Sequence, residues 1–496
     1  MKILFIYPKY PETFWSFRHA LKFVAKKSAF PPLGALTVAA MLPGEWEKRL
    51  VDENVSKLKD KDIEWADMVF ISAMLAQGER AKEIIQRCKE KAKIVVAGGP
   101  AFTSQPEKFE NVDHFVLNEA ETTLPMFLED FENGKLKHIY TSEERPDISK
   151  TPLPLWEILN FKKYSSMAIQ YSRGCPFNCE FCDIIILNGR IPRTKTAEQM
   201  VGEFQHLYDA GWRGSIFVVD DNFIGNKANV KQMLPELIQW QQAHKYPFML
   251  LTEASVNLAE DEELMQMMSR ANFHKVFLGI ETPDSESLKE CGKVQNTNKN
   301  LAESVRLIHN HGMQVMGGFI VGFDNDNELI FDRQIGFIQK AGVVTAMIGT
   351  LTALPHTQLW NRLKTEGRLK GDSTGENTEA SVNFEPKMGR KKLAEGYKNL
   401  VLKAYSYKNY YKRVNTFIKD YKPTAVSRLK KQDIRAFLMS IWRIGIFSKA
   451  SPRYWKLLIK TSITKRKAVP VAVELAICGL HFRKFAKRTA RAVQNI

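Results

Sequence analysis

The sequence predicts an α/β protein of 496 residues with three structural parts. Short apolar runs alternate with stretches of helical periodicity over most of the chain, which is typical of parallel α/β folds. The C-terminal part lacks this alternation and is basic: residues 391–496 hold 26 Lys and Arg against 4 Asp and Glu, and the whole chain has a net charge of +17. We therefore expect an α/β domain over 1–145, a linker over 146–166, a partial six-stranded β/α barrel over 167–370, and a basic, mainly helical domain over 371–496.

The first domain is expected to be a doubly wound parallel sheet, which binds its ligand at the carboxyl ends of the strands. Those ends include Ser72, Met74 and the run Gly98-Gly99-Pro100. The loop after the first strand, Tyr7–Pro11, lacks the G-x-G-x-x-G fingerprint, which disfavours a nicotinamide or flavin cofactor. The predicted strands are Ile3–Tyr7, Met68–Ser72, Ile94–Ala97 and Phe115–Leu117, with helices such as Glu79–Lys91 and Thr122–Phe131 between them.

The second domain repeats the strand–helix alternation six times, which predicts a partial β/α barrel. In such barrels the chemistry takes place at the carboxyl ends of the strands. The predicted strands are Met167–Tyr171, Ser215–Val219, Phe248–Thr252, Lys275–Ile280, Gln314–Ile320 and Val344–Gly349.

Three cysteines, Cys175, Cys179 and Cys182, follow the first barrel strand with the spacing C-x3-C-x2-C. A 4Fe-4S cluster normally has four cysteine ligands, so three would leave one iron open to a small molecule. The alternatives are a zinc knuckle or three unrelated buried thiols. Zinc usually takes four ligands, and no second Cys/His pair follows at ligand spacing. The spacing therefore favours the cluster.

The remaining cysteines, Cys88, Cys291 and Cys478, are isolated and are expected to be free buried thiols. A disulfide framework would be denser and more regular. The chain begins directly with an apolar strand and shows no signal-peptide pattern. An oxygen-sensitive cluster also requires reducing conditions, so we expect a cytoplasmic location. A lipid-facing basic tail, one of its interpretations below, would make the protein peripheral on the inner face of the cell membrane.

The cysteine run, including the aromatic Phe181 before its last cysteine, resembles the radical S-adenosylmethionine (SAM) superfamily. The resemblance implies a 4Fe-4S cluster whose open iron binds SAM, and reductive cleavage of SAM to a 5′-deoxyadenosyl radical by an electron from a ferredoxin or flavodoxin. It also implies that residues at the strand ends contact SAM. Their side chains or backbones suit its ammonium, ribose or adenine groups: Phe181, Asp220, Asp221, Glu253, Glu281 and Gly322.

The first domain combined with this loop resembles the cobalamin-binding branch of the superfamily. The matching runs are Pro31–Gly34, Ala97–Pro100 and Asn118–Glu121. The branch implies a flavodoxin-like (Rossmann-type) domain that holds cobalamin over the barrel mouth through Ser72, Met74 and Gly98-Gly99-Pro100. The D-x-H-x-x-G motif, which supplies a histidine to cobalt elsewhere, is absent, and His19 and His114 do not fit it. A cobalt without a protein histidine would favour methyl transfer to a carbon radical.

The basic tail is open to three interpretations. Trp442, Phe447, Trp455 and their apolar neighbours alternate with Arg and Lys, a pattern that suits a helix at an anionic lipid surface. The charge would also suit RNA, or a solvated basic helical domain. Related methylthiotransferases have a further cysteine trio in the first domain, whereas only Cys88 precedes Cys175 here, so RNA is disfavoured. The stretch Ala468–Leu480 contains Glu474 and is too short to span a bilayer.

The whole chain resembles a lipid-modifying subgroup that includes hopanoid C-2 methylases and archaeal tetraether ring synthases. This resemblance implies cobalamin-dependent methylation of an unactivated carbon of a hopanoid or isoprenoid lipid. The alternatives are radical carbon–carbon bond or ring formation in a membrane lipid, or a non-catalytic cluster-and-cobalamin sensor that binds nucleic acid.

Overall fold

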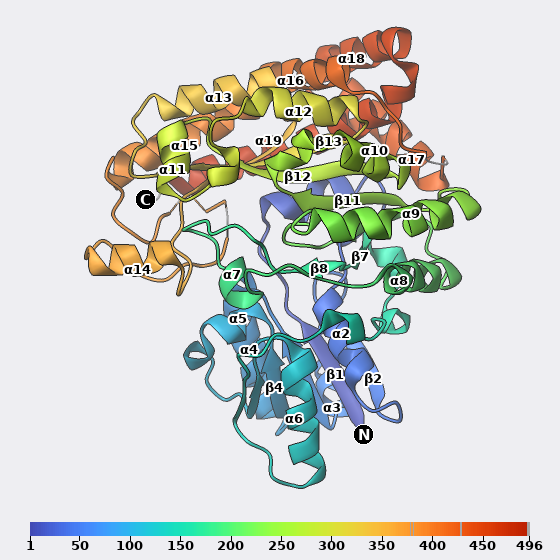
Figure 1. The fold of residues 1–496 in the computed structure, drawn as a ribbon, viewed down its shortest axis with the longest axis vertical. Helices are drawn as coiled ribbons and strands as arrows, with labels where there is room; N and C mark the ends of the chain where they lie inside the picture. Colours follow the sequence, from blue (N-terminus) through green and yellow to red (C-terminus); the bar gives the residue numbers. More distant parts are fainter. Residues whose placement is uncertain (377, 380, 427–428, 494–496) are drawn as a thin grey trace.

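The N-terminal domain is a six-stranded parallel sheet with helices on both faces (Figure 1). The computed structural model describes the whole chain except residues 377, 380, 427–428 and 494–496. The strand order is β2-β1-β3-β4-β5-β6, and its first five strands follow the flavodoxin-like order. The strands are β1 (Lys2–Tyr7), β2 (Glu47–Asp52), β3 (Met68–Ser72), β4 (Ile94–Gly98), β5 (His114–Val116) and β6 (Ile139–Tyr140).

Alternating side chains of this sheet build two separate cores. Ile3 and Phe5 of β1 face α2 and α6, whereas Leu4 and Ile6 face α3, α4 and α5. The inner strands of the sheet are therefore buried on both faces, which explains their continuous apolar runs. The helices are α2 (Leu33–Met41), α3 (Asp60–Trp65), α4 (Gly78–Glu90), α5 (Pro100–Ser104) and α6 (Ala120–Glu132).

The second domain is also a parallel sheet, of order β14-β13-β12-β11-β10-β7. β7 and β14 are its edges, so the barrel is open, and all six predicted strands are confirmed. The strands are β7 (Ser166–Ile169), β10 (Ser215–Val218), β11 (Met249–Ala254), β12 (Phe273–Glu281), β13 (Gln314–Val321) and β14 (Thr345–Thr350). The helices are α8 (Ala197–Asp209), α9 (Lys227–Ala243), α10 (Glu262–Arg270), α11 (Ser285–Glu290), α12 (Leu301–Asn310) and α13 (Ile330–Ala341).

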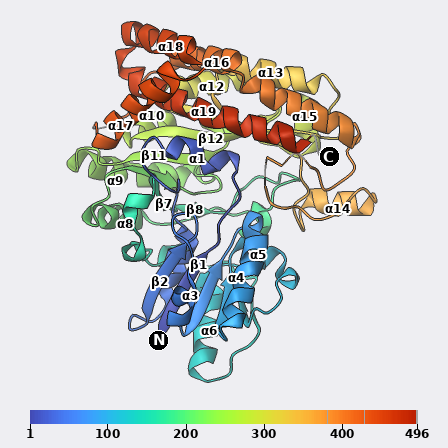
Figure 2. The ribbon, with the colours of Figure 1, turned by 180° about the vertical axis from the view of Figure 1, so that it is seen from behind.

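The C-terminal part packs onto the barrel as a layer of helices (Figures 1 and 2). All of the stretch Ala468–Leu480 except Ala468 lies in the long helix α19, which buries Ala472, Leu475 and Ala476 and pairs its Glu474 with Lys275 of β12. No helix among the described residues is long and apolar enough to cross a bilayer. Helix α14 (Gln358–Thr365) follows the last barrel strand and lies apart from this layer (Figure 1). The helices of the layer are α15 (Arg390–Ala404), α16 (Tyr407–Asp420), α17 (Lys431–Ser440), α18 (Ser451–Thr464) and α19 (Val469–Ala492); the short α1 (Arg18–Leu21) packs against α19.

Three strand elements escaped the sequence prediction. β2 is an edge strand rich in charge (Glu47, Lys48, Arg49), and β6 is an edge strand of two residues, so neither forms an apolar run. The third is a short antiparallel ribbon, β8 (Ser172–Arg173) with β9 (Arg193–Thr194), that encloses the cysteine loop and the short helix α7 (Ile184–Leu187). A two-residue ribbon closed by long-range pairing leaves no periodic pattern.

Candidate active site

The cysteine loop starts at the carboxyl end of β7, and Asp220 after β10 fixes its entry. The buried Asp220 carboxylate accepts hydrogen bonds from the backbone N–H groups of Tyr171 and Ser172, both at 2.8 Å, and from the Ser172 hydroxyl at 2.7 Å. Burial raises the pKa of Asp220 to about 7, although these hydrogen bonds oppose the rise. Because both carboxylate oxygens already accept hydrogen bonds, we propose that Asp220 positions the loop and does not itself contact SAM.

Asp221 has a related role one residue later. Its carboxylate accepts from the N–H of Gly174 at 3.3 Å and from the side-chain amide of Asn188 at 2.8 Å, which ties the start of the loop to the end of α7. Gly174 has φ +97°, and a Cβ there would come within 2.9–3.2 Å of three carbonyl oxygens of residues 188–191. Only glycine fits this crossing of the chain.

Of the three motif thiols, Cys179 is buried and Cys175 and Cys182 are partly buried. Asn222 directs its amide at the Cys175 sulfur and Gln295 directs its amide at the Cys179 sulfur, each at 3.9 Å. Burial raises the pKa of Cys175 and of Cys182, so both thiols are protonated until a metal compensates their charge. No three His, Cys, Asp or Glu side chains within the described residues converge on a single metal ion. A 4Fe-4S cluster does not need such a point, because each thiolate binds a different iron.

A buried ion pair next to these thiols was not foreseen from the sequence. Lys293 donates to Glu281 at 2.8 Å, its ammonium lies 6.0 Å from the ring centroid of Phe181, and both partners of the pair are at most 12% exposed. Burial lowers the pKa of Lys293, but the charges of Glu281 and Cys179 outweigh this and raise it. Lys293 therefore stays cationic beside the cysteine loop and opposes the negative charge of its thiolates.

The backbone near this pair is shaped to admit it. Glu281 has φ +63° at the end of β12, where the pairing with β13 is irregular. A Cβ on Gly279 would lie 2.4 Å from the Glu281 carboxylate and 2.7 Å from the Lys293 ammonium, so a side chain there would push the ion pair aside. Lys293 itself lies between α11 and α12, after neither a strand nor a motif, which is why the strand-end rule could not find it.

Glu253 is the carboxylate of the predicted set that stays free. It lies half-buried in β11, and no side-chain hydrogen bond to it occurs among the described residues. Burial raises its pKa to about 8, and the charges of Asp221 and Asp220 add to the rise. With no side-chain partner in the described part of the chain, Glu253 is the carboxyl group of this set that is open to a ligand, and a bound cation would favour its ionised form.

Gly322 behaves differently from the other predicted residues. Its N–H donates to Asp326 at 2.8 Å, and a Cβ there would meet Leu393 of α15 at 2.9 Å. This part of Gly322 therefore faces the C-terminal helices. Its contact with the adenine of SAM stays a prediction.

The residues predicted for cobalamin gather at the carboxyl ends of β3 and β4. Gly99 has φ +95°, and a Cβ on it would lie 3.1 Å from the Ser72 hydroxyl. A Cβ on Gly98 would lie 2.7 Å from the Val116 carbonyl oxygen, and Pro100 begins α5. Met74 is 56% exposed beside them. The adjacent glycines leave a side-chain-free backbone with an exposed thioether next to it, which suits a bulky flat ligand.

Five charged side chains join the two domains at this edge. Glu119, 6% exposed, accepts from Arg173 at 2.8 Å and from both terminal nitrogens of Arg193 at 2.7 and 3.0 Å. Glu121 accepts from Arg173 at 2.7 and 2.9 Å, and Arg145 adds a weaker contact to Glu119 at 3.4 Å. We call Glu119, Glu121, Arg173 and Arg193 the interdomain clamp. The clamp fixes the start of α6 to the β8–β9 ribbon that frames the cysteine loop.

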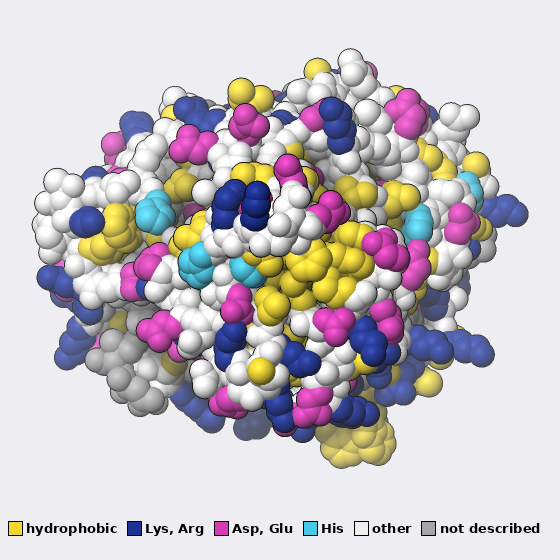
Figure 3. Space-filling view, turned by 90° about the horizontal axis from the view of Figure 1, so that it is seen from below, with side chains coloured by type: hydrophobic (Ala, Val, Ile, Leu, Met, Phe, Trp, Pro, Cys, Tyr) yellow, Lys and Arg dark blue, Asp and Glu magenta, His cyan; other side chains and the backbone are white. Residues whose placement is uncertain are grey.

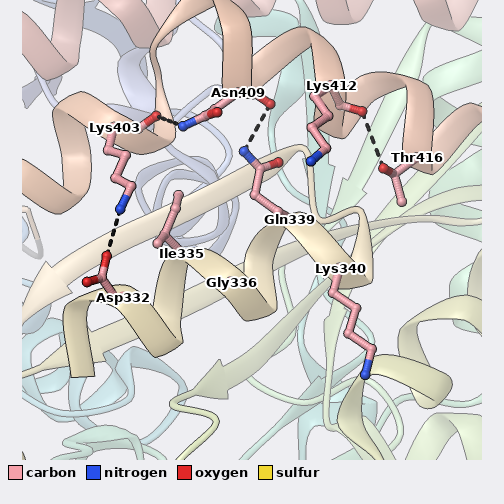
Figure 4. Close-up of a pocket in the computed structure, with 9 residues that line it drawn as sticks. All are labelled: Asp332, Ile335, Gly336, Gln339, Lys340, Lys403, Asn409, Lys412 and Thr416. Carbon is pink, nitrogen blue, oxygen red and sulfur yellow. Dashed lines mark hydrogen bonds and ion pairs between the residues drawn. The ribbon is translucent and has the colours of Figure 1, made fainter. Parts of the chain in front are cut away.

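A groove of about 570 Å³ lies elsewhere, between α13 and α16 (Figure 4). Lys403 pairs with Asp332 at 2.6 Å across it, and Gln339 donates to the Asn409 carbonyl. None of the residues predicted for the cysteine loop or the cofactors lines it. The groove lies on the outer helices and is not part of the candidate site.

Comparisons with known proteins agree with this geometry. Residues 169–338 match the radical SAM superfamily, residues 24–128 match the B12 binding domain, and residues 357–495 match a domain of unknown function. The fold is similar to that of the cobalamin-dependent SAM radical enzyme OxsB, with a TM-score of 0.64 at 15% identity, over 100% of this chain and 80% of that one. The chain thus has the domains that bind a 4Fe-4S cluster, SAM and cobalamin.

Two relatives are similar over most of their length. An uncharacterized methyltransferase of Synechocystis sp. is 44% identical over 92% of this chain and 86% of its own. A hopanoid C-2 methylase of Rhodopseudomonas palustris is 33% identical over 100% of this chain and 95% of its own. The chain belongs to the cobalamin-binding radical S-adenosylmethionine methyltransferases.

Proposed function

We propose that this methyltransferase acts on an unactivated carbon of a hopanoid or isoprenoid lipid. The observation that carries the proposal is the similarity to the hopanoid C-2 methylase, which extends over the whole chain and so includes the C-terminal helices. The apolar, basic surface of those helices, with Trp442, Phe447 and Trp455 exposed, is consistent with a substrate that resides in a membrane.

We assign the residues of this chain to two sites, one for the cluster with SAM and one for cobalamin. Cys175, Cys179 and Cys182 would hold the cluster, and Lys293 would balance its charge. When bound, the cluster with SAM supplies a carbon radical and cobalamin supplies the methyl group. Glu253 would accept the ammonium of SAM, and the bare backbone of Gly98-Gly99 would support cobalamin. The interdomain clamp would hold the two sites in register.

An isotope experiment tests the lipid proposal. Cells that express the gene and a strain without it are fed methionine labelled in its methyl group, and their extracted lipids are compared by mass spectrometry. We expect one lipid class to carry the label only in the presence of the gene. A product that is unlabelled but cyclised or newly carbon–carbon bonded would instead support the bond-forming alternative. Labelling confined to a non-lipid product would contradict the proposed substrate.

Glu253→Gln tests the SAM site through its pH dependence. The pKa of Glu253 is about 8 in the folded chain against an ordinary 4.5, so the folded state retains a proton that the unfolded state loses. Stability from this group is fully present below about pH 4.5 and is lost as the pH rises through about 8. The cofactor-free variant should therefore gain thermal stability over the wild type above pH 8 and show little difference below pH 4.5.

The same variant should bind SAM about tenfold to a hundredfold more weakly, because a hydrogen bond to a charged group contributes roughly 1.5–3 kcal/mol. Calorimetric melting at several pH values and equilibrium binding of SAM measure the two effects. Glu260→Gln is the control, since Glu260 is an exposed residue paired on the surface with Lys299. Unchanged SAM affinity in Glu253→Gln would remove Glu253 from the site.

A further inference from the structure

Part of the C-terminal domain forms a helical hairpin. We define the hairpin as residues 431–464: α17, a π-helical turn (Ile441–Ile446) and α18. α18 lies at the end of the molecule away from the N-terminal sheet, and α17 lies at the level of the barrel sheet (Figures 1 and 2). The inner side of the hairpin is closed by Ile444, Leu457 and a hydrogen bond of 2.7 Å between Ser440 and Tyr454. α18 packs on α16 and α19, so the hairpin is anchored.

The outer side of the hairpin is apolar. Two rows of exposed side chains four residues apart, a spacing that places them on one face, run along the hairpin: one on α17 and continued by the π-helical turn, the other on α18. The exposed fractions are 54%, 60% and 60% for Ile434, Leu438 and Trp442, and 38%, 58% and 80% for Trp455, Ile459 and Ile463. Contiguous exposure of this kind marks an interaction surface rather than ordinary surface scatter.

The two rows meet at an aromatic tip. The rings of Trp442 and Phe447 lie 4.7 Å apart, edge to face, and Phe447 is 68% exposed. The Trp455 indole donates to the Gly445 carbonyl at 3.0 Å and so fixes the start of the second row against the turn. The tip is therefore ordered by its own contacts while its rings face outward.

The charge of the hairpin is predominantly positive. Residues 431–464 contain seven Lys and Arg and one acidic residue, Asp433, whose carboxylate caps the start of α17 by accepting the Lys430 N–H. Lys449, Arg453, Lys456 and Lys460 are exposed, and none has an acidic partner within ion-pair distance in the part of the chain that the structure describes. The opposite end of the molecule differs, because there Lys and Arg are interspersed with Asp and Glu around the apolar side chains (Figure 3).

The exposed apolar rows, the aromatic tip and the positive charge together favour an anionic bilayer as the partner over RNA or a second copy of the chain. RNA would use the cations and stack on the aromatic rings, but it gains nothing from exposed isoleucines and leucine. A second copy would bring the same positive charges together, which disfavours self-association. An anionic bilayer can contact all three features. Its acyl chains can pack against the aliphatic rows, its interface can accommodate the tryptophan rings, and its lipid phosphates can bind the Lys and Arg head groups.

We propose that this hairpin docks the protein on the surface of an anionic lipid bilayer, with the Trp442–Phe447 tip in the headgroup region. The docking does not depend on which substrate is methylated. It requires no membrane-spanning helix, since the two short helices lie along the interface.

Vesicle flotation of the full-length protein tests this proposal. The probes are vesicles of phosphatidylcholine alone and of phosphatidylcholine mixed with phosphatidylglycerol. We expect the wild type to float with the mixed vesicles and to bind neutral vesicles far more weakly. Trp442→Ser combined with Phe447→Ser, and separately Lys456→Glu combined with Lys460→Glu, should each weaken binding to mixed vesicles by about tenfold or more.

Leu329→Ser is the matched control, because Leu329 is 61% exposed at the start of α13, outside the hairpin. It should float like the wild type, and melting temperatures establish that all variants are folded. Two results would overturn the proposal: no flotation of the wild type, or flotation of the hairpin variants equal to that of the wild type. If the wild type does not float, loss of self-association or of RNA binding in the hairpin variants would assign the surface to that other partner.

Discussion

Cys179→Ala should abolish both the iron–sulfur cluster and SAM cleavage. Cys179 is 7% exposed and is the central thiol of the loop, so no solvent ligand can replace it without opening the site. Three cysteines already leave one iron open, and a second open iron makes a 4Fe-4S cluster labile. We expect reconstituted variant protein to lose the visible cluster absorption and most of its bound iron. With dithionite and SAM it should form no 5′-deoxyadenosine.

Cys291→Ala is the sharp control for this experiment. Cys291 is a buried thiol in the same region, and its carbonyl accepts the N–H of Glu180 in the loop, a contact that alanine preserves. Its own thiol contacts the Leu288 carbonyl at 3.6 Å and is outside the motif. Iron content and cleavage should therefore match the wild type. A cluster that survives Cys179→Ala, or that is lost in Cys291→Ala, would refute the assignment of the three ligands.

Glu119→Gln should uncouple methyl transfer from SAM cleavage. Glu119 compensates Arg173 and Arg193 at a buried junction, and removal of one partner of a buried ion pair costs about 3–5 kcal/mol because the remaining charges stay buried. The junction is the link between the start of α6 and the ribbon that frames the cysteine loop. The separate domain cores do not involve Glu119, so both domains should stay folded.

A small misplacement of reacting groups costs about a hundredfold in rate. We therefore expect methylated product to fall by about a hundredfold, while 5′-deoxyadenosine formation and cobalamin absorption fall much less. Lys82→Gln serves as control, since Lys82 and Glu79 form an ion pair on the surface of α4, where such pairs contribute little. An unchanged ratio of methylated product to 5′-deoxyadenosine would show that the clamp does not position the two sites.

Much of the fold could be read from local patterns. Buried strands such as Met68–Ser72 and Gln314–Ile320 are apolar over their whole length, because helices cover both faces of a parallel sheet. Edge strands were not predicted, because they are less buried and do not form apolar runs. β2 is paired on one side only and contains Glu47, Lys48 and Arg49. Cys88 and Cys291 are buried free thiols, as expected, whereas Cys478 is only partly buried.

The roles of the site residues were harder to predict from the sequence than the fold. The strand-end rule placed Asp220 and Asp221 beside the cysteine loop, but it could not distinguish a group that braces the backbone from one that is open to a ligand. Glu253 differs from them only because no donor of the described fold reaches it. Asp372, in the polar stretch after the barrel, pairs with Lys108 of the N-terminal domain at 2.6 Å, a long-range contact that no local pattern indicates.

By itself the sequence determined the three thiols, their position after the first barrel strand and the alternation that builds both sheets. These are properties of spacing along the chain, and spacing is local. The tertiary structure alone decided that Lys293 lies beside Glu281 and the cysteines, and that Glu119 receives Arg173 and Arg193 from the other domain. Such convergence depends on strand order and loop paths across dozens of residues, which no local period encodes. The thiol motif therefore predicted a cluster, and the fold showed which charged residues lie beside the motif and link it to the N-terminal domain.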